Sequence, residues 1–384
     1  MIPHTGSRIA TGASPGVRWL VLALVAGCQG SGAMVHFPRT TRITVGQYEA
    51  APRRAVAVER VLCDGASDTL CRFSRLPAIA LASGGHVLVA PFGGKLTELD
   101  SAGRAVRVFG TTSGEGSYRI VAGVTLDSAR NIWLFDVAGG RWLGFSAAGA
   151  FLSAQPVARL PGVADFVARD GALFLQVIPP GKSVGAPVIS SFLRVAAGAK
   201  ERVVARVPAF ARQTSASEFL PVPRLFEAKP VFDAAPDGSL AYSNSASYDL
   251  MWFAPGGAPE LQVEGQGIEP PLVTPQEIAA ETASLRRPSP GQPGTVWSVQ
   301  AARRHPAITA LRYLRDSIVM VRCSPEAGRD SVRWDLWDAS AVLHGYVLLG
   351  VADHVVDGTL DHLLVVSWSR DTPGRIAWLR ISRS

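Results

Sequence analysis

The sequence predicts an all-β protein: a six-bladed β-propeller with four-stranded blades, an N-terminal strand that closes the last blade, and one inserted helix. A short turn followed by an apolar strand recurs six times along the chain. These strands end at Ala90, Asp136, Val177, Asn244, Arg322 and Trp368. The clearest two units begin at Gly93 and Gly139, an offset of 46 residues. Four strands in about 45 residues is the period of a propeller blade.

Composition and charge exclude several other classes. The chain has 384 residues, 47% hydrophobic and 18% charged, which excludes a disordered polyelectrolyte. No apolar run reaches the roughly 18 residues of a membrane span, which excludes a polytopic membrane protein. Without residues 1–27, which hold two Arg and no acid, 36 basic and 31 acidic residues remain, about +5. Since no Lys/Arg cluster with interleaved aromatic residues occurs, nucleic acid is not an expected partner.

The N-terminus has the order of an export signal. Arg8 and Arg18 form a basic region without acidic residues. Residues 19–26 (WLVLALVA) then form an apolar stretch that is too short to span a membrane. This order is typical of a secretory signal peptide, so we expect the mature protein in an oxidising compartment outside the cytoplasm.

The apolar stretch leads into the tetrapeptide VAGC, whose last residue is Cys28. This tetrapeptide resembles the lipobox of bacterial lipoproteins. The resemblance implies that residues 1–27 are a signal peptide, that Cys28 is lipidated, and that residues 28–50 are a tether to a membrane. Because Gln29 stands where an inner-membrane retention signal has Asp, it also implies the outer membrane. The alternative is an ordinary signal peptide in which the cysteine stands by chance.

Three further cysteines follow. Cys63 and Cys71 flank the turn-like stretch DGASDTL, so we expect them to form a disulfide in an oxidising compartment. Cys323 ends an apolar strand and is expected to be a buried free thiol. Metal binding by these cysteines is disfavoured, because the chain has no CxxC or paired Cys/His spacing.

The propeller is expected to occupy residues 51–384. Each turn-plus-strand unit is preceded by one strand-like run, and most are followed by two more. The last unit supplies only three strands, ending with RIAWLRI at residues 375–381. We therefore expect residues 54–62 (RAVAVERVL) to be the fourth strand of blade six, which closes the ring.

These units resemble the six-bladed NHL-repeat-like propellers, including members found in bacterial lipoproteins. The resemblance covers residues 50–383 and is strongest in blades one and two, where the linker FGTTSGEGSY lies. It is diffuse in blades three to five. The alternative fold is a pair of β-sandwiches with similar alternation of apolar residues.

Three units are lengthened by insertions. Residues 177–190 separate the second and third strands of blade three, residues 207–226 join blades three and four, and residues 266–305 join blades four and five. In a propeller, these connections all emerge on one face, so the insertions are expected around one mouth of the channel. The turns on the opposite face are all short.

The insertion at residues 266–305 predicts one helix, from Pro275 to Arg287. Thr274 is a good N-cap, and Glu277 completes a capping box. Pro288 ends the helix. The helix is expected to rim or cover the channel mouth.

Arginines in the last two insertions predict a basic rim at this mouth, suited to an anionic ligand. They are Arg212, Arg224, Arg286, Arg287, Arg303 and Arg304. Binding residues concentrate on loops that a rigid scaffold holds in place. The alternative is that the insertions only fill space over the channel.

No common catalytic motif occurs, but three acids fall on the predicted innermost strands: Asp165, Asp233 and Asp353. Carboxylates around an axis could hold Ca²⁺. Calcium-dependent lactonases of the gluconolactonase type use such a site, together with Asn. Here Asn131 and Asn244 lie away from the axis, which departs from that pattern.

Together these features predict a membrane-anchored envelope lipoprotein that acts as a non-catalytic binding module. Its ligand would be a protein, a peptide or a small molecule, and no cofactor is expected. The alternative is a calcium-dependent, lactonase-like hydrolase with the metal at the axial acids. A propeller fold alone does not decide between the two.

Overall fold

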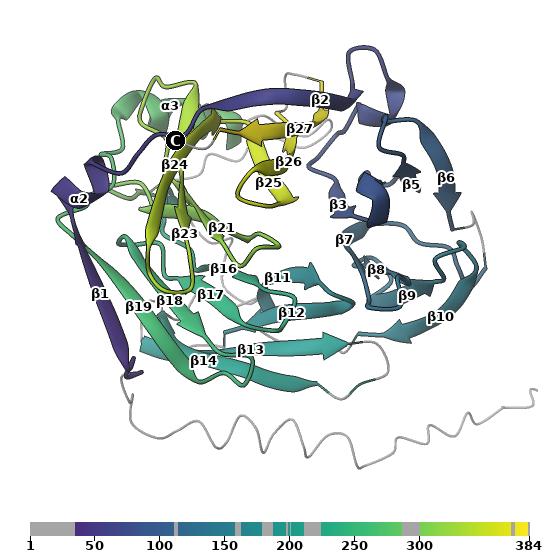
Figure 1. The fold of residues 1–384 in the computed structure, drawn as a ribbon, viewed down its shortest axis with the longest axis horizontal. Coiled ribbons are helices and arrows are strands. Elements are labelled where there is room, and N and C mark those ends of the chain that lie inside the picture. The colour runs from purple at the N-terminus through teal and green to yellow at the C-terminus, as the bar shows by residue number, and fades with distance from the viewer. Residues whose placement is uncertain are drawn as a thin grey trace, which may run out of the picture.

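The computed structural model describes residues 35–110, 114–157, 163–178, 187–196, 199, 201–210, 224–285, 300–369 and 373–382 (Figure 1). The predicted signal peptide, the lipidation site Cys28 and the beginning of the tether lie outside these residues. Arg212, Arg286 and Arg287 of the predicted basic rim lie outside them too. None of the helices in the described ranges is long and apolar enough to cross a membrane.

Six antiparallel sheets form the blades, arranged around a central axis (Figure 1). Blade one contains β3 (Ala78–Leu81), β4 (Val87–Ala90), β5 (Leu96–Leu99) and β6 (Ala105–Phe109). Blade two contains β7 (Val121–Leu126), β8 (Ile132–Asp136), β9 (Arg141–Phe145) and β10 (Phe151–Pro156). Blade three contains β11 (Val163–Arg169), β12 (Ala172–Val177), β13 (Pro187–Ala196) and β14 (Arg202–Phe210).

The other three blades follow the same order along the chain. Blade four contains β16 (Val231–Ala234), β17 (Leu240–Ser243), β18 (Asp249–Phe253) and β19 (Pro259–Gln266). Blade five contains β21 (Ile308–Tyr313), β22 (Val319–Cys323), β23 (Ser331–Trp337) and β24 (Leu343–Gly350). Blade six contains β25 (Asp353–Gly358), β26 (His362–Ser367), β27 (Arg375–Ile381) and the N-terminal strand β2 (Val56–Asp64).

The ring is closed, which confirms the predicted six-bladed propeller. The innermost strands β3, β7, β11, β16, β21 and β25 each contact the next, and β25 contacts β3. β2 pairs antiparallel with β27 from Val56↔Ile381 to Asp64↔Arg375, so a strand from near the N-terminus completes the last blade. Without β2, the outer edge of β27 would be left unpaired.

Each gap between neighbouring blades holds its own apolar core, so the described residues form six clusters for six gaps. The strands supply them with large side chains because a wedge-shaped gap widens away from the axis. Trp142, Trp252, Trp334 and Trp337 are all at most 2% exposed and occupy these gaps. Their packing agrees with a structural role for the tryptophans.

The second half of the predicted tether is folded against the propeller. β1 (Arg39–Thr44) pairs parallel with β19 at the outer edge of blade four, and the short helix α2 (Val45–Glu49) follows. Pro52 and Arg54 then exchange backbone hydrogen bonds with Tyr346 of β24, at 3.0 and 2.8 Å. Together with β2, residues 39–64 thus run along the outer edges of blades four, five and six, and we name them the strap (Figure 1).

Two of the three insertions pack against each other. β15 (Arg224–Leu225) pairs parallel with β20 (Gln300–Ala301), which links the connection before blade four to the connection before blade five. The helix α3 (Pro275–Leu285) lies between blades four and five in sequence, and Thr274 and Glu277 form the predicted capping box. Glu277 also contacts His305 at 3.1 Å, which holds the helix against the connection that leads into β21.

Cys63 and Cys71, the pair expected from the sequence, are joined by a disulfide with their Cα atoms 5.9 Å apart. The bridge ties the end of β2 to the short 3₁₀ turn Thr69–Cys71, in the gap between blades six and one. Cys323 is a buried free thiol at the end of β22.

Candidate functional site

Asp233 of the predicted axial acids is fully buried, and its carboxylate is already surrounded by donors. The backbone N–H groups of Tyr313 and Ala234 donate to it at 2.8 and 2.9 Å. The guanidinium groups of Arg169 and Arg312 lie 3.4 and 3.5 Å from its Oδ2. Two cations and two amides therefore occupy the positions that a metal ion would need.

The other two predicted acids do not join Asp233. Asp165 is exposed near the start of β11, whereas Asp353 accepts hydrogen bonds from Gly350 N at 2.8 Å and Ser367 Oγ at 2.5 Å. Within the part of the chain that the structure describes, no group of three or more His, Cys, Asp or Glu side chains could hold a metal ion. The described residues do not fit the calcium site of the lactonase alternative, because arginines neutralise the central carboxylate.

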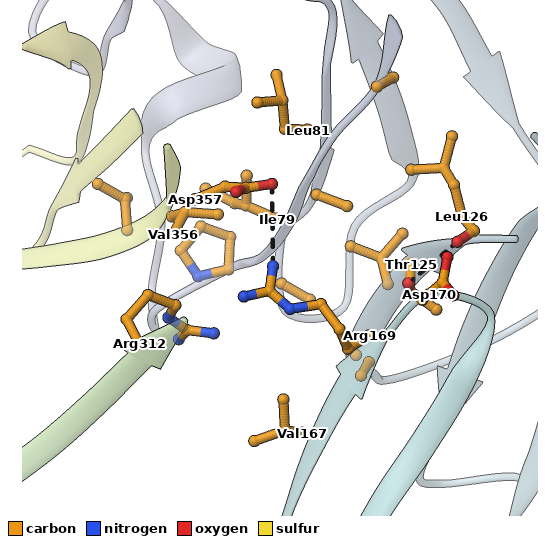
Figure 2. Close-up of a pocket in the computed structure, with 18 of the residues that line it drawn as sticks. Ile79, Leu81, Thr125, Leu126, Val167, Arg169, Asp170, Arg312, Val356 and Asp357 are labelled. Carbon is orange, nitrogen blue, oxygen red and sulfur yellow. Dashed lines mark hydrogen bonds and ion pairs between the residues drawn. The ribbon is translucent and has the colours of Figure 1, made fainter. Parts of the chain in front are cut away.

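The axis instead contains a cavity of about 540 Å³ (Figure 2). Its apolar walls come from the innermost strands of blades one, two, three and six, among them Ile79, Val124, Val167 and Val356. Blades four and five contribute only Pro236, Arg312 and Arg315, at or just after the ends of β16 and β21. A mainly apolar cavity with a few convergent polar groups is typical of a small-molecule site.

The cavity runs along the axis and reaches the face where the short turns lie, while Leu76, at its other end before β3, is exposed too. Arg130, Asp170 and Arg315 line it, and all three belong to turns that connect a first strand to a second strand and are exposed to solvent. The insertions at residues 177–190 and 266–305 adjoin the opposite ends of β12 and β21. We name the end of the cavity at the short turns the short-turn mouth.

Arg169 is the central polar group of the cavity. It ends β11, and Figure 2 shows its guanidinium pointing across the cavity towards Asp357. Nε donates to Ala234 O at 3.1 Å, and Nη2 donates to Tyr313 O and approaches Asp233. Nη1 lies 3.9 Å from Asp357, which is an ion pair but not a hydrogen bond.

Arg312 and Arg315 stand beside it on blade five. Arg312 donates from Nε to Val355 O at 3.1 Å, which joins blade five to blade six. Arg315 contacts Asp357 from Nε at 3.1 Å and donates from Nη2 to Leu81 O of blade one at 3.0 Å. Backbone carbonyls of several blades thus fix the guanidinium groups in place.

His354 also lines the cavity, on β25. Burial lowers the pKa of its imidazole to about 4, and the charges of Arg322 and Arg312 act in the same direction, against Asp353. His354 is therefore neutral at physiological pH, and the cationic groups of the cavity are its arginines.

Of the predicted basic rim, the structure describes the side chains of Arg303 and Arg304 only, and these lie towards the other mouth. Arg303 and Arg304 precede β21, whereas Arg315 follows it, so they lie towards opposite ends of the same strand. Arg303 is exposed, and Arg304 is held by Glu269 at 2.5 Å and by Pro270 O at 2.8 Å. Arg224 lies in β15, and the structure describes only its backbone.

Arg169 and Arg315 were not among the residues predicted for the site. They stand in the short turns before the second strands of blades three and five, which the sequence marks only as turns. The signal was the position of a long basic side chain at the end of an innermost strand in blades three and five. The partners Asp233 and Asp357 come from two other blades, so no local pattern connects them.

The chain matches no model of a known protein family, and no curated protein matches its sequence. Among solved structures, it is similar to a Bacteroides fragilis protein described as exported, with 10% identity, a TM-score of 0.48, and 90% of this chain and 99% of that chain covered. Virginiamycin B lyase from Staphylococcus aureus, an inactive variant with quinupristin, has 10% identity and a TM-score of 0.42 over 85% and 99% of the chains.

Aldose sugar dehydrogenase from Streptomyces coelicolor, in its PQQ-bound form, has 14% identity and a TM-score of 0.44 over 87% of this chain and 100% of its own. These proteins are described as a lyase, a dehydrogenase and an exported protein. Propellers host many activities, and similarities this low carry no argument about which one this chain has.

Proposed function

We propose that this chain is a lipid-anchored envelope protein, an NHL-repeat-like propeller that binds a small molecule in the axial cavity at its short-turn mouth, without catalysis. The observation that carries the proposal is the cavity itself: about 540 Å³, mainly apolar, and crossed by an arginine that backbone carbonyls hold in place. Pre-organised polar groups in an apolar cavity favour binding because little entropy is lost when a ligand enters.

A cavity-filling substitution tests the proposal. N-phenyl-1-naphthylamine, a neutral apolar fluorophore small enough for the cavity, should bind the protein and fluoresce. Val167→Trp places an indole among the lining residues and should reduce the affinity at least tenfold. Val163→Trp on the same strand is the matched control, because Val163 is 41% exposed and does not line the cavity. Equal affinity in the two variants, or no binding to the parent protein, would contradict the proposed site.

Anchoring is tested separately. Cys28→Ser removes the thiol that the lipobox resemblance assigns to lipidation. More than one acyl chain makes membrane attachment stable, so the parent protein should be recovered in the membrane fraction and the variant should not. If both fractionate alike, the lipid-anchor part of the proposal is wrong, and the cavity part is unaffected.

A further inference from the structure

We infer that the axial cavity recognises an organic anion with an apolar body, such as a carboxylate, a sulfonate or a phosphate ester, and that its acidic group binds to Arg169 and Arg312 on the side that faces the cavity. This inference rests on the proposed function, since it names the ligand class of the same cavity.

The two guanidinium groups are neighbours with donors to spare. Both approach the same oxygen, Oδ2 of Asp233, at 3.4 and 3.5 Å. Arg169 uses Nε and Nη2 for backbone carbonyls, but its Nη1 has Asp357 only at 3.9 Å. Arg312 uses Nε for Val355 O, and its side chain remains 32% exposed in the cavity. Asp233 Oδ2 already lies between them. An acidic oxygen on the cavity side of the pair, in reach of Arg169 Nη1 and Arg312, would receive charge-assisted hydrogen bonds from two arginines.

The formal charges of the cavity nearly balance. The lining residues include four arginines and three aspartates, and Asp233 lies buried beneath them. The charged lining residues are Arg130, Arg169, Arg312, Arg315, Asp127, Asp170 and Asp357. Net charge therefore does not select the ligand, and recognition depends on directed N–H groups.

The lining aspartates are placed differently from the arginine pair. Asp127 accepts from Asn131 N, Asn131 Nδ2 and Trp133 Nε1 at 2.8 to 3.0 Å, so its carboxylate is held within its own turn. Asp357 is held by Arg315, and Asp170 lies across the cavity from Arg312 (Figure 2). An acidic group bound at Arg169 and Arg312 would therefore sit on the blade-five side, away from Asp170.

The rest of the cavity suits an apolar body. Ile79, Val124, Val167 and Val356 line it together with Phe166. Burying apolar ligand surface here contributes about 25 cal/mol per Å² before the costs of association are subtracted. An inorganic anion would leave these walls hydrated, whereas an amphipathic anion would contact both kinds of wall.

Two fluorophores with the same ring system separate the charge from the apolar body. 8-Anilinonaphthalene-1-sulfonate carries a sulfonate that N-phenyl-1-naphthylamine lacks. Charge-assisted hydrogen bonds are worth about 1.5–3 kcal/mol, so the sulfonate should bind at least about tenfold more tightly by fluorescence titration. Arg312→Gln should remove most of this preference, because it should weaken binding of the sulfonate at least about tenfold more than binding of the neutral fluorophore. The matched control Arg303→Gln alters an exposed arginine at the other mouth and should keep the preference.

A competition experiment needs no variant and so does not depend on Arg312→Gln folding. Octanesulfonate should displace the neutral fluorophore at a concentration at least about tenfold lower than octanol does. Equal affinity of the two fluorophores, together with equal displacement, would overturn the inference while the proposed function stands. Loss of the preference in Arg303→Gln would overturn it in favour of the insertion mouth. Failure of Val167→Trp to weaken the neutral fluorophore would overturn the proposed function instead.

Discussion

The gap between blades four and five differs in construction from the gap between blades two and three. Among the described residues, the four/five gap buries sixteen core side chains. One of them, Ile43, comes from the strap, and Tyr48 of the strap packs beside them. The two/three gap buries four, of which Trp133 and Trp142 stack with their ring centroids 6.2 Å apart. The ring is therefore reinforced unequally, most where the N-terminal segment crosses it.

A buried polar network adds to the four/five gap. Tyr248 donates to Asp335 at 2.5 Å and accepts from Trp337 Nε1 at 2.9 Å. Arg333 donates to Asp335 at 2.5 Å, and its guanidinium lies over the ring of Tyr48 at 3.7 Å. Burial raises the pKa of the Asp335 carboxyl, and Arg333 opposes that shift. Satisfied buried networks specify one arrangement of the groups they connect.

The difference bears on the axial cavity. Arg312 and Arg315 belong to blade five, which the strap and the network hold on one side. The apolar wall at Val124 and Val167 belongs to blades two and three. These blades approach each other closely because Gly123 has no side chain. A Cβ on Gly123 would lie 2.9 Å from Ala168 Cβ. We infer that the blade-five side of the cavity, with Arg312 and Arg315, is the rigid side.

The largest expected change in the free energy of unfolding comes from replacing one tryptophan in each of the two gaps. Trp337→Ala should lower the free energy of unfolding by about 3–5 kcal/mol, because it removes a fully buried ring and leaves the Tyr248 hydroxyl without its donor. Trp142→Ala should cost less, since its buried Nε1 has no hydrogen-bond partner among the described residues. Denaturant unfolding of both variants measures the difference, and the reverse order would break the comparison.

The gap between blades six and one, which contains the disulfide, is a third region to compare. Replacing Cys63 and Cys71 with Ser removes a crosslink between residues that are 8 apart in sequence. The chain-entropy relation then gives a loss of about 2.5 kcal/mol. Denaturant unfolding under non-reducing conditions checks this value, with the parent protein in reductant as the matched sample. If neither treatment lowers stability, the gap between blades six and one depends on packing alone.

The strap is tested at Tyr48. Tyr48→Ala removes its contacts with the Tyr248 ring, 5.1 Å away, and with Arg333, and should cost about 2 kcal/mol. Val45→Ala on the same helix is the control, because Val45 is 36% exposed and should change stability by less than about 0.5 kcal/mol. Equal effects of the two substitutions would show that α2 does not reinforce the four/five gap.

The ring could be predicted from the sequence, whereas the strap and the axial arginines could not. Repetition of a turn plus an apolar strand predicts the ring, and the missing fourth strand of blade six predicts the role of β2. Ahead of β2, the strap contributes only Ile43 and Tyr48 to the apolar cores of the described residues, and two positions form no period that marks it in the sequence. The pairing of Arg169 with Asp233 joins blades three and four, and it becomes visible only after the blades are placed around an axis.

The smallest expected effect is the pH dependence of stability caused by His354, which distinguishes charge at the axis from packing in the gaps. Burial holds the pKa of His354 at about 4, below its usual 6.5, so the unfolded chain binds this proton more readily than the folded protein does. Stability should therefore fall as the pH drops from about 6.5 to about 4, by about 1 kcal/mol between pH 7 and pH 5 after allowing for partial solvation. His354→Gln cannot titrate, and its unfolding free energy should change less over this range. Denaturant unfolding at pH 7, 6 and 5 measures both slopes.

Because neither Trp337 nor Trp142 titrates, the difference between their Ala variants should stay constant over the same range. If the stability difference between the two Ala variants instead changes with pH as the unfolding free energy of the parent protein does, charge at the axis, and not the apolar core of the gap, holds blade five in place.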